Sequence, residues 1–265
     1  MSPRIALTIA GSDPSGGAGI QADLKTFSAL GVYGTAVITA LTAQNTRAVT
    51  GVRPVDADFV VEQLKTLIAD VRIDAIKIGM LGTAELVRAV TRFLDRYPCP
   101  TVVLDPVMVA TSGDLLLAPD SLDAIRDALP RASLITPNLA EAATLLDQPV
   151  AHDIPTMHQQ AKELATLGAP RVLVKGGHLT DTAVDVLYLD GRTVELTAQR
   201  IATPNTHGTG CSLSSAITAI HTRQPDWLET VSSAKHWLTA AIRAADHLNV
   251  GTGHGPVHHF HQWWN

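Results

Sequence analysis

Cysteine, aromatic and charged residues are all scarce in this chain of 265 residues. It has two cysteines, Cys99 and Cys211, 4% aromatic residues and 17% Asp, Glu, Lys and Arg. Two cysteines do not make a disulfide framework, so we expect a cytoplasmic protein. No apolar run approaches the roughly 20 residues of a membrane helix, and no signal-peptide pattern opens the chain. We therefore predict no membrane partner.

An excess of positive charge is also missing. The formal net charge is -5, from 20 basic and 25 acidic residues. Nucleic-acid surfaces usually need clustered Lys and Arg, so we predict no nucleic-acid partner. Hydrophobic residues make up 46% of the chain, which supports a substantial core. Any phosphate site must therefore be built from local geometry rather than from bulk charge.

Short apolar runs alternate with helical patterns along most of the chain. The runs at 75–78 and 101–104 predict buried strands, and the apolar stripe over 58–69 predicts a helix. This alternation is typical of a mostly parallel sheet covered by helices on both faces. We expect a single α/β domain over residues 1–265. Within it, residues 251–265 form an irregular C-terminal tail whose histidines are solvated.

Glycines and small residues mark the segment 205–216, NTHGTGCSLSSA. Gly208 and Gly210 let the backbone approach an oxyanion closely. The free amides of Thr209, Gly210 and Cys211 would then gather at a helix N-terminus, which favours negative charge. A flexible helix start is the plain alternative, but the longer context favours a phosphate site. The segment is neither a Walker A loop nor a dinucleotide fingerprint.

Further motifs stand in order along the chain: GSDPSGGAG at 11–19, QADLK at 21–25, TAQN at 42–45, KIGM at 77–80, LDPVM at 104–108, TPNLAE at 136–141 and VKGGH at 174–178. Together with the 205–216 segment, they resemble the hydroxymethylpyrimidine/phosphomethylpyrimidine kinases of thiamine synthesis. That family belongs to the ribokinase-like superfamily, and the resemblance runs from about Ile5 to His247. It implies a three-layer α/β/α fold, a homodimer, and ATP with Mg²⁺. It also implies two successive phosphorylations of a hydroxymethyl aminopyrimidine.

The backbone donors of Gly208, Thr209, Gly210 and Cys211 are the predicted catalytic group, because they would hold charge on the transferring phosphoryl group. Ribokinase-like enzymes generally place an Asp at the position of Cys211, as general base. A thiol at a helix N-terminus can have a lowered pKa, so Cys211 could accept the hydroxyl proton. It could also be only a close polar contact, or a small buried residue.

Polar residues that follow other predicted strands are candidates for binding the nucleotide and its metal ion. Asp105 and Glu141 are predicted to hold Mg²⁺, often through water. Asn138, Lys175 and Thr203 are predicted to contact the nucleotide. Asn138 and Glu141 also have the spacing of a capping pair, and both roles can hold together. Lys175 could alternatively be an exposed residue at a strand end.

The predicted substrate pocket holds a neutral aminopyrimidine. Gln44 offers a donor and an acceptor on one amide, which matches a ring nitrogen beside an exocyclic amine. Gly11 could contribute backbone contacts, and Asp23 could bond the amine or the hydroxyl. Met80 and Val107 would form apolar walls, although ordinary core packing explains them equally well.

Two rival functions remain. Another kinase of the superfamily could act on pyridoxal or pyridoxine, which also carry a hydroxymethyl group on an aromatic ring. A non-catalytic pyrimidine-binding protein could have kept the fold. The intact Asp105, Glu141, Lys175 and 208–211 loop favour an enzyme over such a sensor.

Overall fold

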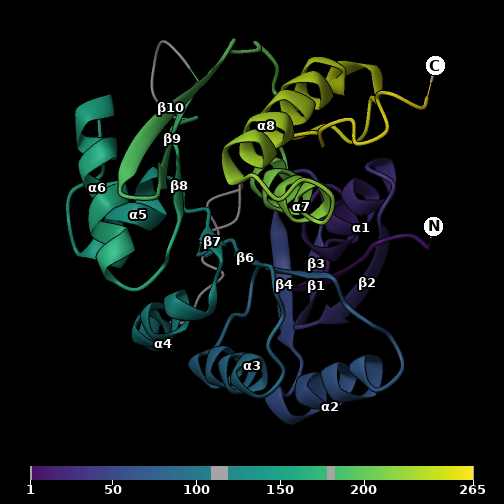
Figure 1. Cartoon of the computed structure of the whole chain (residues 1–265). Helices are drawn as coiled ribbons and strands as arrows, with labels where there is room; N and C mark the ends of the chain where they lie inside the picture. Colours follow the sequence, from purple (N-terminus) through teal and green to yellow (C-terminus); the bar gives the residue numbers. More distant parts are fainter. Residues whose placement is uncertain (1, 109–118, 178–182, 265) are drawn as a thin grey trace.

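The apolar runs of the sequence form a central eight-stranded sheet in the computed structural model, which describes residues 2–108, 119–177 and 183–264 (Figure 1). Its strand order is β10-β9-β8-β7-β6-β5-β1-β2. The strands are β1 (Ile5–Ala10), β2 (Tyr33–Ile38), β5 (Ala75–Ile78), β6 (Val102–Leu104), β7 (Leu134–Ile135), β8 (Val172–Lys175), β9 (Ala183–Leu189) and β10 (Arg192–Ala198). The last residue of the VKGGH motif, at 178, lies outside the described residues.

Neighbouring strands from β2 to β8 are parallel, and β9 pairs antiparallel with both β8 and β10. Parallel strands buried on both faces need continuous apolar sequence, which explains the four buried residues of β5. All carboxyl ends of the parallel strands lie at one edge. The residues that follow them therefore meet there.

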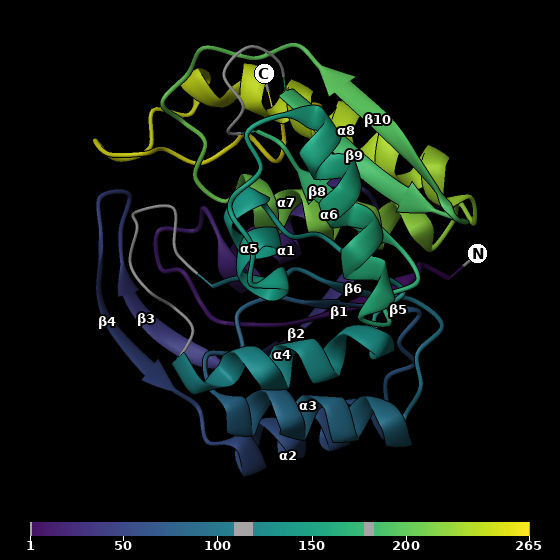
Figure 2. The ribbon, with the colours of Figure 1, turned by 90° about the vertical axis from the view of Figure 1, so that its left-hand side faces the viewer.

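Helices cover both faces of the sheet, as Figures 1 and 2 show. On one face lie α1 (Gly19–Ala29), α7 (Thr209–His221) and α8 (Trp227–Arg243). On the other lie α2 (Ala57–Ile68), α3 (Ala84–Arg96), α4 (Leu122–Ala128), α5 (Leu139–Leu146) and α6 (Ile154–Thr166). The predicted three-layer α/β/α fold is confirmed.

A separate hairpin projects from this sandwich. It consists of β3 (Ala40–Gln44) and β4 (Val49–Pro54), which pair antiparallel with a register irregularity at Ala43/Gln44. No sequence pattern predicted β4, because its residues are half exposed and lack strict alternation. The hairpin brings Gln44 toward the carboxyl edge of the main sheet.

The tail beyond residue 250 has no helix or strand among its described residues, as predicted, but it is not simply solvated. His258 and His259 are buried, and the His258 amide donates to the Ala241 carbonyl at 3.0 Å. The Trp263 indole donates to the Ala29 carbonyl at 3.1 Å. The tail therefore packs on the helical layer, and the solvated-tail prediction is wrong for these histidines.

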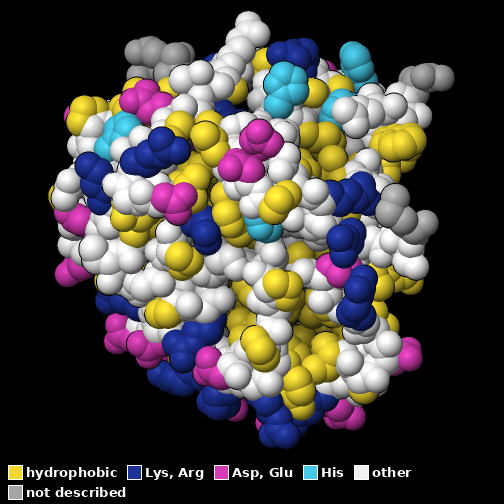
Figure 3. Space-filling view, viewed as in Figure 1, with side chains coloured by type: hydrophobic (Ala, Val, Ile, Leu, Met, Phe, Trp, Pro, Cys, Tyr) yellow, Lys and Arg dark blue, Asp and Glu magenta, His cyan; other side chains and the backbone are white. Residues whose placement is uncertain are grey.

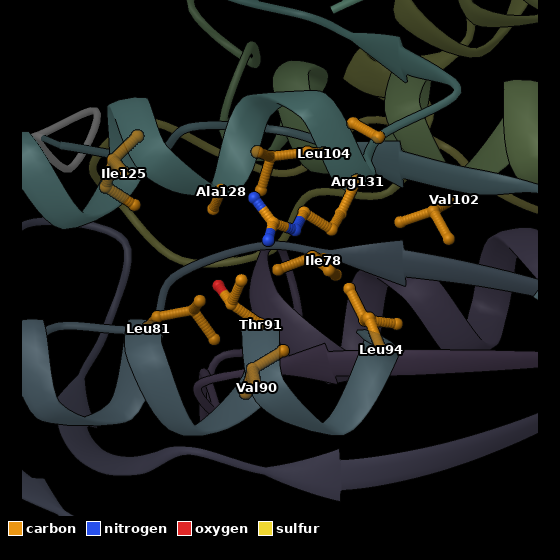
Figure 4. Close-up of a pocket in the computed structure, with 11 residues that line it drawn as sticks. Ile78, Leu81, Val90, Thr91, Leu94, Val102, Leu104, Ile125, Ala128 and Arg131 are labelled. Atoms are coloured by element: carbon orange, nitrogen blue, oxygen red, sulfur yellow. The ribbon is translucent and has the colours of Figure 1, made fainter. Parts of the chain in front are cut away.

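Charges of both signs are mixed on the face shown in Figure 3, where Lys and Arg alternate with Asp and Glu. Within the described ranges, no helix is both long enough and apolar enough to cross a membrane. Between α3, α4 and the sheet lies a small apolar void of about 10 Å³, lined by Leu81, Val90 and Leu104 among others (Figure 4). Space on the scale of one water molecule between packed aliphatic side chains belongs to the core and cannot hold a substrate.

Candidate active site

A cavity of about 920 Å³ opens at the carboxyl edge of the sheet. This is within the range of small-molecule sites. Its walls include most of the residues predicted from sequence, although they come from segments far apart in the chain. These are Gly11, Gln44, Met80, Asp105, Val107, Asn138, Glu141, Lys175, Gly208, Thr209, Gly210 and Cys211.

The anion loop, residues 208–211, forms the first turn of α7. Gly208 is its N-cap, with φ 76° in the left-handed region. A Cβ at Gly208 would lie 1.7 Å from the Gly17 carbonyl oxygen, so only glycine fits there. The amides of Gly210 and Cys211 have no partner within the helix, as for every first turn. The Thr209 amide instead reaches the Thr206 carbonyl at 3.3 Å, so the predicted free donor at Thr209 is not available.

The Cys211 thiol faces the cavity but is enclosed by protein on its other sides. Burial raises its pKa to about 11, and Asp23 and Asp105 add to this rise. The ammonium of Lys77 and the amide of Gly19 act in the opposite direction. The lowered pKa predicted from the helix N-terminus is therefore wrong for this cavity, because desolvation outweighs the dipole.

Lys175 lies between the two carboxylates predicted to hold metal. Its Nζ lies 2.7 Å from Asp105 Oδ1 and 3.9 Å from Glu141 Oε2. Burial raises the pKa of Glu141 to about 7, which Lys175 opposes and Asp105 increases. Burial alone would lower the pKa of Lys175, but the two carboxylates outweigh it and raise this pKa. Lys175 is thus a largely enclosed cation at the cavity wall, with 14% of its side chain exposed, and not an exposed strand-end lysine.

Asn138 and Glu141 form a reciprocal capping box at the start of α5. The Glu141 amide donates to Asn138 Oδ1 at 2.9 Å, and the Asn138 amide donates to Glu141 Oε2 at 2.7 Å. The capping explanation is confirmed for both residues. Both also line the cavity, so capping fixes their orientation there.

The residues near Lys175 include ligands of the type that bind Mg²⁺ together with a nucleotide. Asp105 and Glu141 supply carboxylate oxygens, and Mg²⁺ commonly uses one or two carboxylates with water and substrate phosphates. Among the described residues, no cluster of three or more His, Cys, Asp or Glu could hold a metal by protein ligands alone.

Another part of the cavity lining is made of uncharged residues. Gln44 ends β3, and its Oε1 accepts a hydrogen bond from Thr42 Oγ1 at 3.3 Å. A Cβ at Gly11 would lie 2.4 Å from the Met80 methyl group, so glycine makes room for this side chain. Met80 is buried and Val107 half-buried in the cavity wall. This part offers an amide between apolar walls.

Asp23 lies behind the cavity wall and does not line it. Its carboxylate accepts from Lys77 Nζ at 2.8 and 3.0 Å, Thr8 Oγ1 at 2.6 Å and Ser215 Oγ at 2.7 Å. Asp23 and Lys77 are both fully buried. With its acceptor sites already used, Asp23 supports the site from behind, and the structure does not show the predicted direct contact with substrate.

Thr203 is also outside the cavity lining. Its hydroxyl bonds Asp246, as does the Asn205 amide nitrogen at 2.7 Å. Thr203 therefore anchors the segment before the anion loop. The cavity is bordered instead by the nearby Arg200, Ile201 and Thr206.

Three functional candidates escaped the sequence reasoning. Lys77 lines the cavity from the middle of β5, where a lysine within an apolar strand was the available signal. Asp13 and His207 also line it, with His207 Nε2 2.8 Å from Asp13 Oδ2. They stand 194 positions apart. No spacing rule connects residues at that separation.

Comparison with known proteins places this site in a family. The model of the phosphomethylpyrimidine kinase family matches residues 13–258. A hydroxymethylpyrimidine/phosphomethylpyrimidine kinase of Escherichia coli is 56% identical over 261 residues, 98% of each chain.

Solved structures of related kinases have a similar fold. An ADP complex of Bacillus subtilis pyridoxal kinase has a TM-score of 0.91 and 38% identity, with 100% of each chain covered. A phosphomethylpyrimidine kinase of Clostridium difficile has a TM-score of 0.80 and 39% identity, covering 90% of this chain and 99% of that one. The chain therefore belongs to the phosphomethylpyrimidine kinase family.

Proposed function

We propose that this protein transfers the γ-phosphoryl group of ATP to 4-amino-5-hydroxymethyl-2-methylpyrimidine, and then a second phosphoryl group to the monophosphate. The product is the pyrophosphate used in thiamine biosynthesis. The observation that carries the proposal is that the anion loop and the Gln44 amide open onto one cavity. Its size accommodates a small ring and nucleotide phosphates together.

Substrate recognition follows from the uncharged part of the cavity lining. The Gln44 amide can donate to a ring nitrogen and accept from the neighbouring amine. Met80 and Val107 contact the ring faces, and Gly11 keeps the backbone close to the ring edge. The hydroxymethyl group then points toward Cys211 and the anion loop.

Transfer requires alignment and charge neutralisation more than covalent chemistry. The hydroxymethyl oxygen bonds the γ-phosphorus as the phosphorus–oxygen bond to ADP breaks, and the electron pair leaves with ADP. The Gly210 and Cys211 amides stabilise the equatorial oxygens. Lys175 contacts the transferring phosphate, and Asn138 borders the nucleotide. The thiolate of Cys211, a minor fraction because burial raises the pKa of its thiol to about 11, accepts the hydroxyl proton.

Magnesium supplies charge neutralisation when it is bound with the nucleotide. Asp105 and Glu141 would hold it, through water where their oxygens already accept hydrogen bonds. Because Glu141 is fixed by the capping box and Asp105 by Lys175, both carboxylates are oriented before the nucleotide arrives.

Pyridoxal phosphorylation is a second candidate activity, because the Bacillus subtilis pyridoxal kinase has a TM-score of 0.91 with this chain. Steady-state ADP formation with hydroxymethylpyrimidine, its monophosphate and pyridoxal separates the candidates. We expect the highest kcat/KM with the pyrimidines. A higher value with pyridoxal would reassign the substrate. Absence of turnover with ligand-dependent stabilisation would identify a pyrimidine sensor.

We also propose a cytoplasmic homodimer, in line with the family resemblance. Exposed Leu41 and Phe59, each 54% accessible, leave apolar surface near β3 and α2 that a second copy could cover. Light scattering of the purified protein at micromolar concentration gives the test. A monomer mass would contradict the dimer without affecting the kinase proposal.

A further inference from the structure

Two loops that are far apart in the sequence meet at one buried hydrogen bond beside the cavity. The glycine loop, residues 11–19, follows β1, and the anion loop opens α7. His207 Nε2 lies 2.8 Å from Asp13 Oδ2. Asp13 is 1% exposed and His207 6% exposed. Since a carboxylate only accepts, Nε2 carries the hydrogen of this bond.

Asp13 also organises its own loop. Its carboxylate accepts from the Ser15 amide and hydroxyl at 2.9 and 2.7 Å, the Gly17 amide at 3.1 Å and the Ala18 amide at 2.8 Å. Burial opposes ionisation of Asp13, but the bonds from His207, Ser15 and Ala18 prevail and lower its pKa to about 2. The carboxylate is therefore a fixed charge around which residues 13–18 fold.

The glycine loop and the anion loop are in close van der Waals contact, without space for an additional side-chain carbon. A Cβ at Gly208 would lie 1.7 Å from the Gly17 carbonyl oxygen, and a Cβ at Gly17 would lie 2.3 Å from the His207 ring. Backbone meets backbone here, so a small shift of His207 displaces Gly208. Gly208 is the N-cap of α7, and its position sets the direction of the next amides.

The same loop reaches the pyrimidine side. Ser12, which precedes Asp13, accepts from the Thr42 amide at 3.2 Å and from Thr42 Oγ1 at 2.9 Å. Thr42 Oγ1 lies 3.3 Å from Gln44 Oε1. Hydrogen bonds from Gln44 through Thr42 to Ser12, and from Asp13 to His207, are joined by the peptide bonds Ser12–Asp13 and His207–Gly208, and together they connect the Gln44 amide to the anion loop.

We propose that Asp13 and His207 are positioning residues whose bond holds the anion loop at a fixed distance from the pyrimidine pocket. This inference rests on the proposed function. The pair contacts no reacting atom in the mechanism above, and it acts by aligning the hydroxyl oxygen with the phosphorus. Misplacement by about 1 Å can cost roughly a hundredfold in rate. Loss of the bond should therefore lower kcat and leave pyrimidine affinity nearly unchanged.

Two substitutions that differ by one methylene group test the bond. In His207→Gln the amide nitrogen can reach Asp13, whereas in His207→Asn it is too short. We expect His207→Asn to lose about a hundredfold in kcat and His207→Gln to stay within about fivefold of wild type. Calorimetric titration with hydroxymethylpyrimidine should give unchanged stoichiometry and a Kd within about threefold for both. His254→Gln, at an exposed tail histidine, is the matched control.

Asp13→Asn offers an independent route if His207→Asn does not fold. Asn keeps the side-chain size, but its NH2 group cannot accept the hydrogen bonds that one Asp13 oxygen now accepts. We therefore expect a similar fall in kcat. Equal kcat for His207→Asn and His207→Gln, or normal kcat in Asp13→Asn, would overturn the inference. If wild type and His254→Gln both fail to phosphorylate any pyrimidine, the proposed function fails instead.

Discussion

The two ends of the cavity are built in different ways. The proposed phosphate end consists of helix amides and the ionisable side chains of Lys175, Asp105 and Glu141, and its residues come from four separate segments. The proposed pyrimidine contacts are the Gln44 amide and the apolar side chains of Met80 and Val107, all from the first 107 residues, in a cavity whose lining also includes Asp13 and Lys77.

This difference suggests that one group of residues acts in phosphoryl transfer and the other determines which substrate binds. A backbone nest and a buried cation recognise any phosphoryl group, because they read charge and shape. One amide beside aliphatic walls reads the edge of a particular ring. Changes at the phosphate end should therefore affect kcat for every substrate, and changes at the pyrimidine end should affect KM for one of them.

The largest expected effect is at Gly210. A Cβ there would lie 3.3 Å from Lys175 Nζ and 3.6 Å from Asp105 Oδ2, in the part of the cavity where we propose that phosphate binds. We expect Gly210→Val to lower kcat by on the order of a thousandfold for all substrates while the protein stays folded. Gly51→Val, on strand β4, is the control, because Val is well tolerated in strands. Near-normal kcat in Gly210→Val would remove the anion-loop assignment.

Cys211 should have the next largest effect. We expect Cys211→Ala to lower kcat of the first phosphorylation by about a hundredfold, since general-base contributions are commonly of that size. Because the thiol pKa is raised to about 11, kcat of wild type should rise with pH between 7 and 9, and that of the variant should not. A loss below about tenfold, with parallel pH profiles, would leave Cys211 only a packing role.

Gln44 tests the other end of the cavity. We expect Gln44→Ala to raise KM for hydroxymethylpyrimidine about 10- to 100-fold, the cost of removing hydrogen bonds to a buried ring. Saturated kcat and KM for ATP should change little. An unchanged pyrimidine KM would refute the recognition role. A fall in kcat with every substrate would show that the two ends are not separable.

Substitution of Glu141 should have the smallest effect, and this effect concerns the pH dependence of the free energy of unfolding. The pKa of Glu141 is raised to about 7, chiefly by burial, so between its ordinary value and pH 7 the folded protein holds a proton that the unfolded chain has lost. Stability should therefore fall as pH rises through that window. Glu141→Gln should flatten this dependence by on the order of 2 to 3 kcal/mol between pH 5 and 8. Urea unfolding without nucleotide or Mg²⁺ measures it. Parallel profiles would contradict the shift.

The sequence predicted the backbone features of the proposed phosphate end, because these features are local. A glycine-bounded helix start needs only a few adjacent residues, and its left-handed N-cap at Gly208 follows from glycine alone. The capping box of Asn138 and Glu141 is local in the same way. Gln44 and Lys175, which were chosen for their side-chain chemistry and their place after predicted strands, both line the cavity.

The sequence failed where partners are distant. Asp23 was predicted to contact substrate, but Ser215, 192 positions later, joins Lys77 in occupying its carboxylate. The Cys211 pKa was predicted from the helix terminus alone, and burial reversed its direction. The tail histidines looked solvated, since nothing nearby in sequence reveals that α8 covers His258.

Composition, periodicity and motif order were thus enough to predict the α/β/α architecture and the glycine-capped helix start at Gly208, because both arise from short-range backbone preferences. Folding decided which side chains share the cavity, which of them are desolvated, and that Asp13 meets His207. Those properties depend on the dielectric environment and on contacts between segments that only the packed sheet and helices bring together.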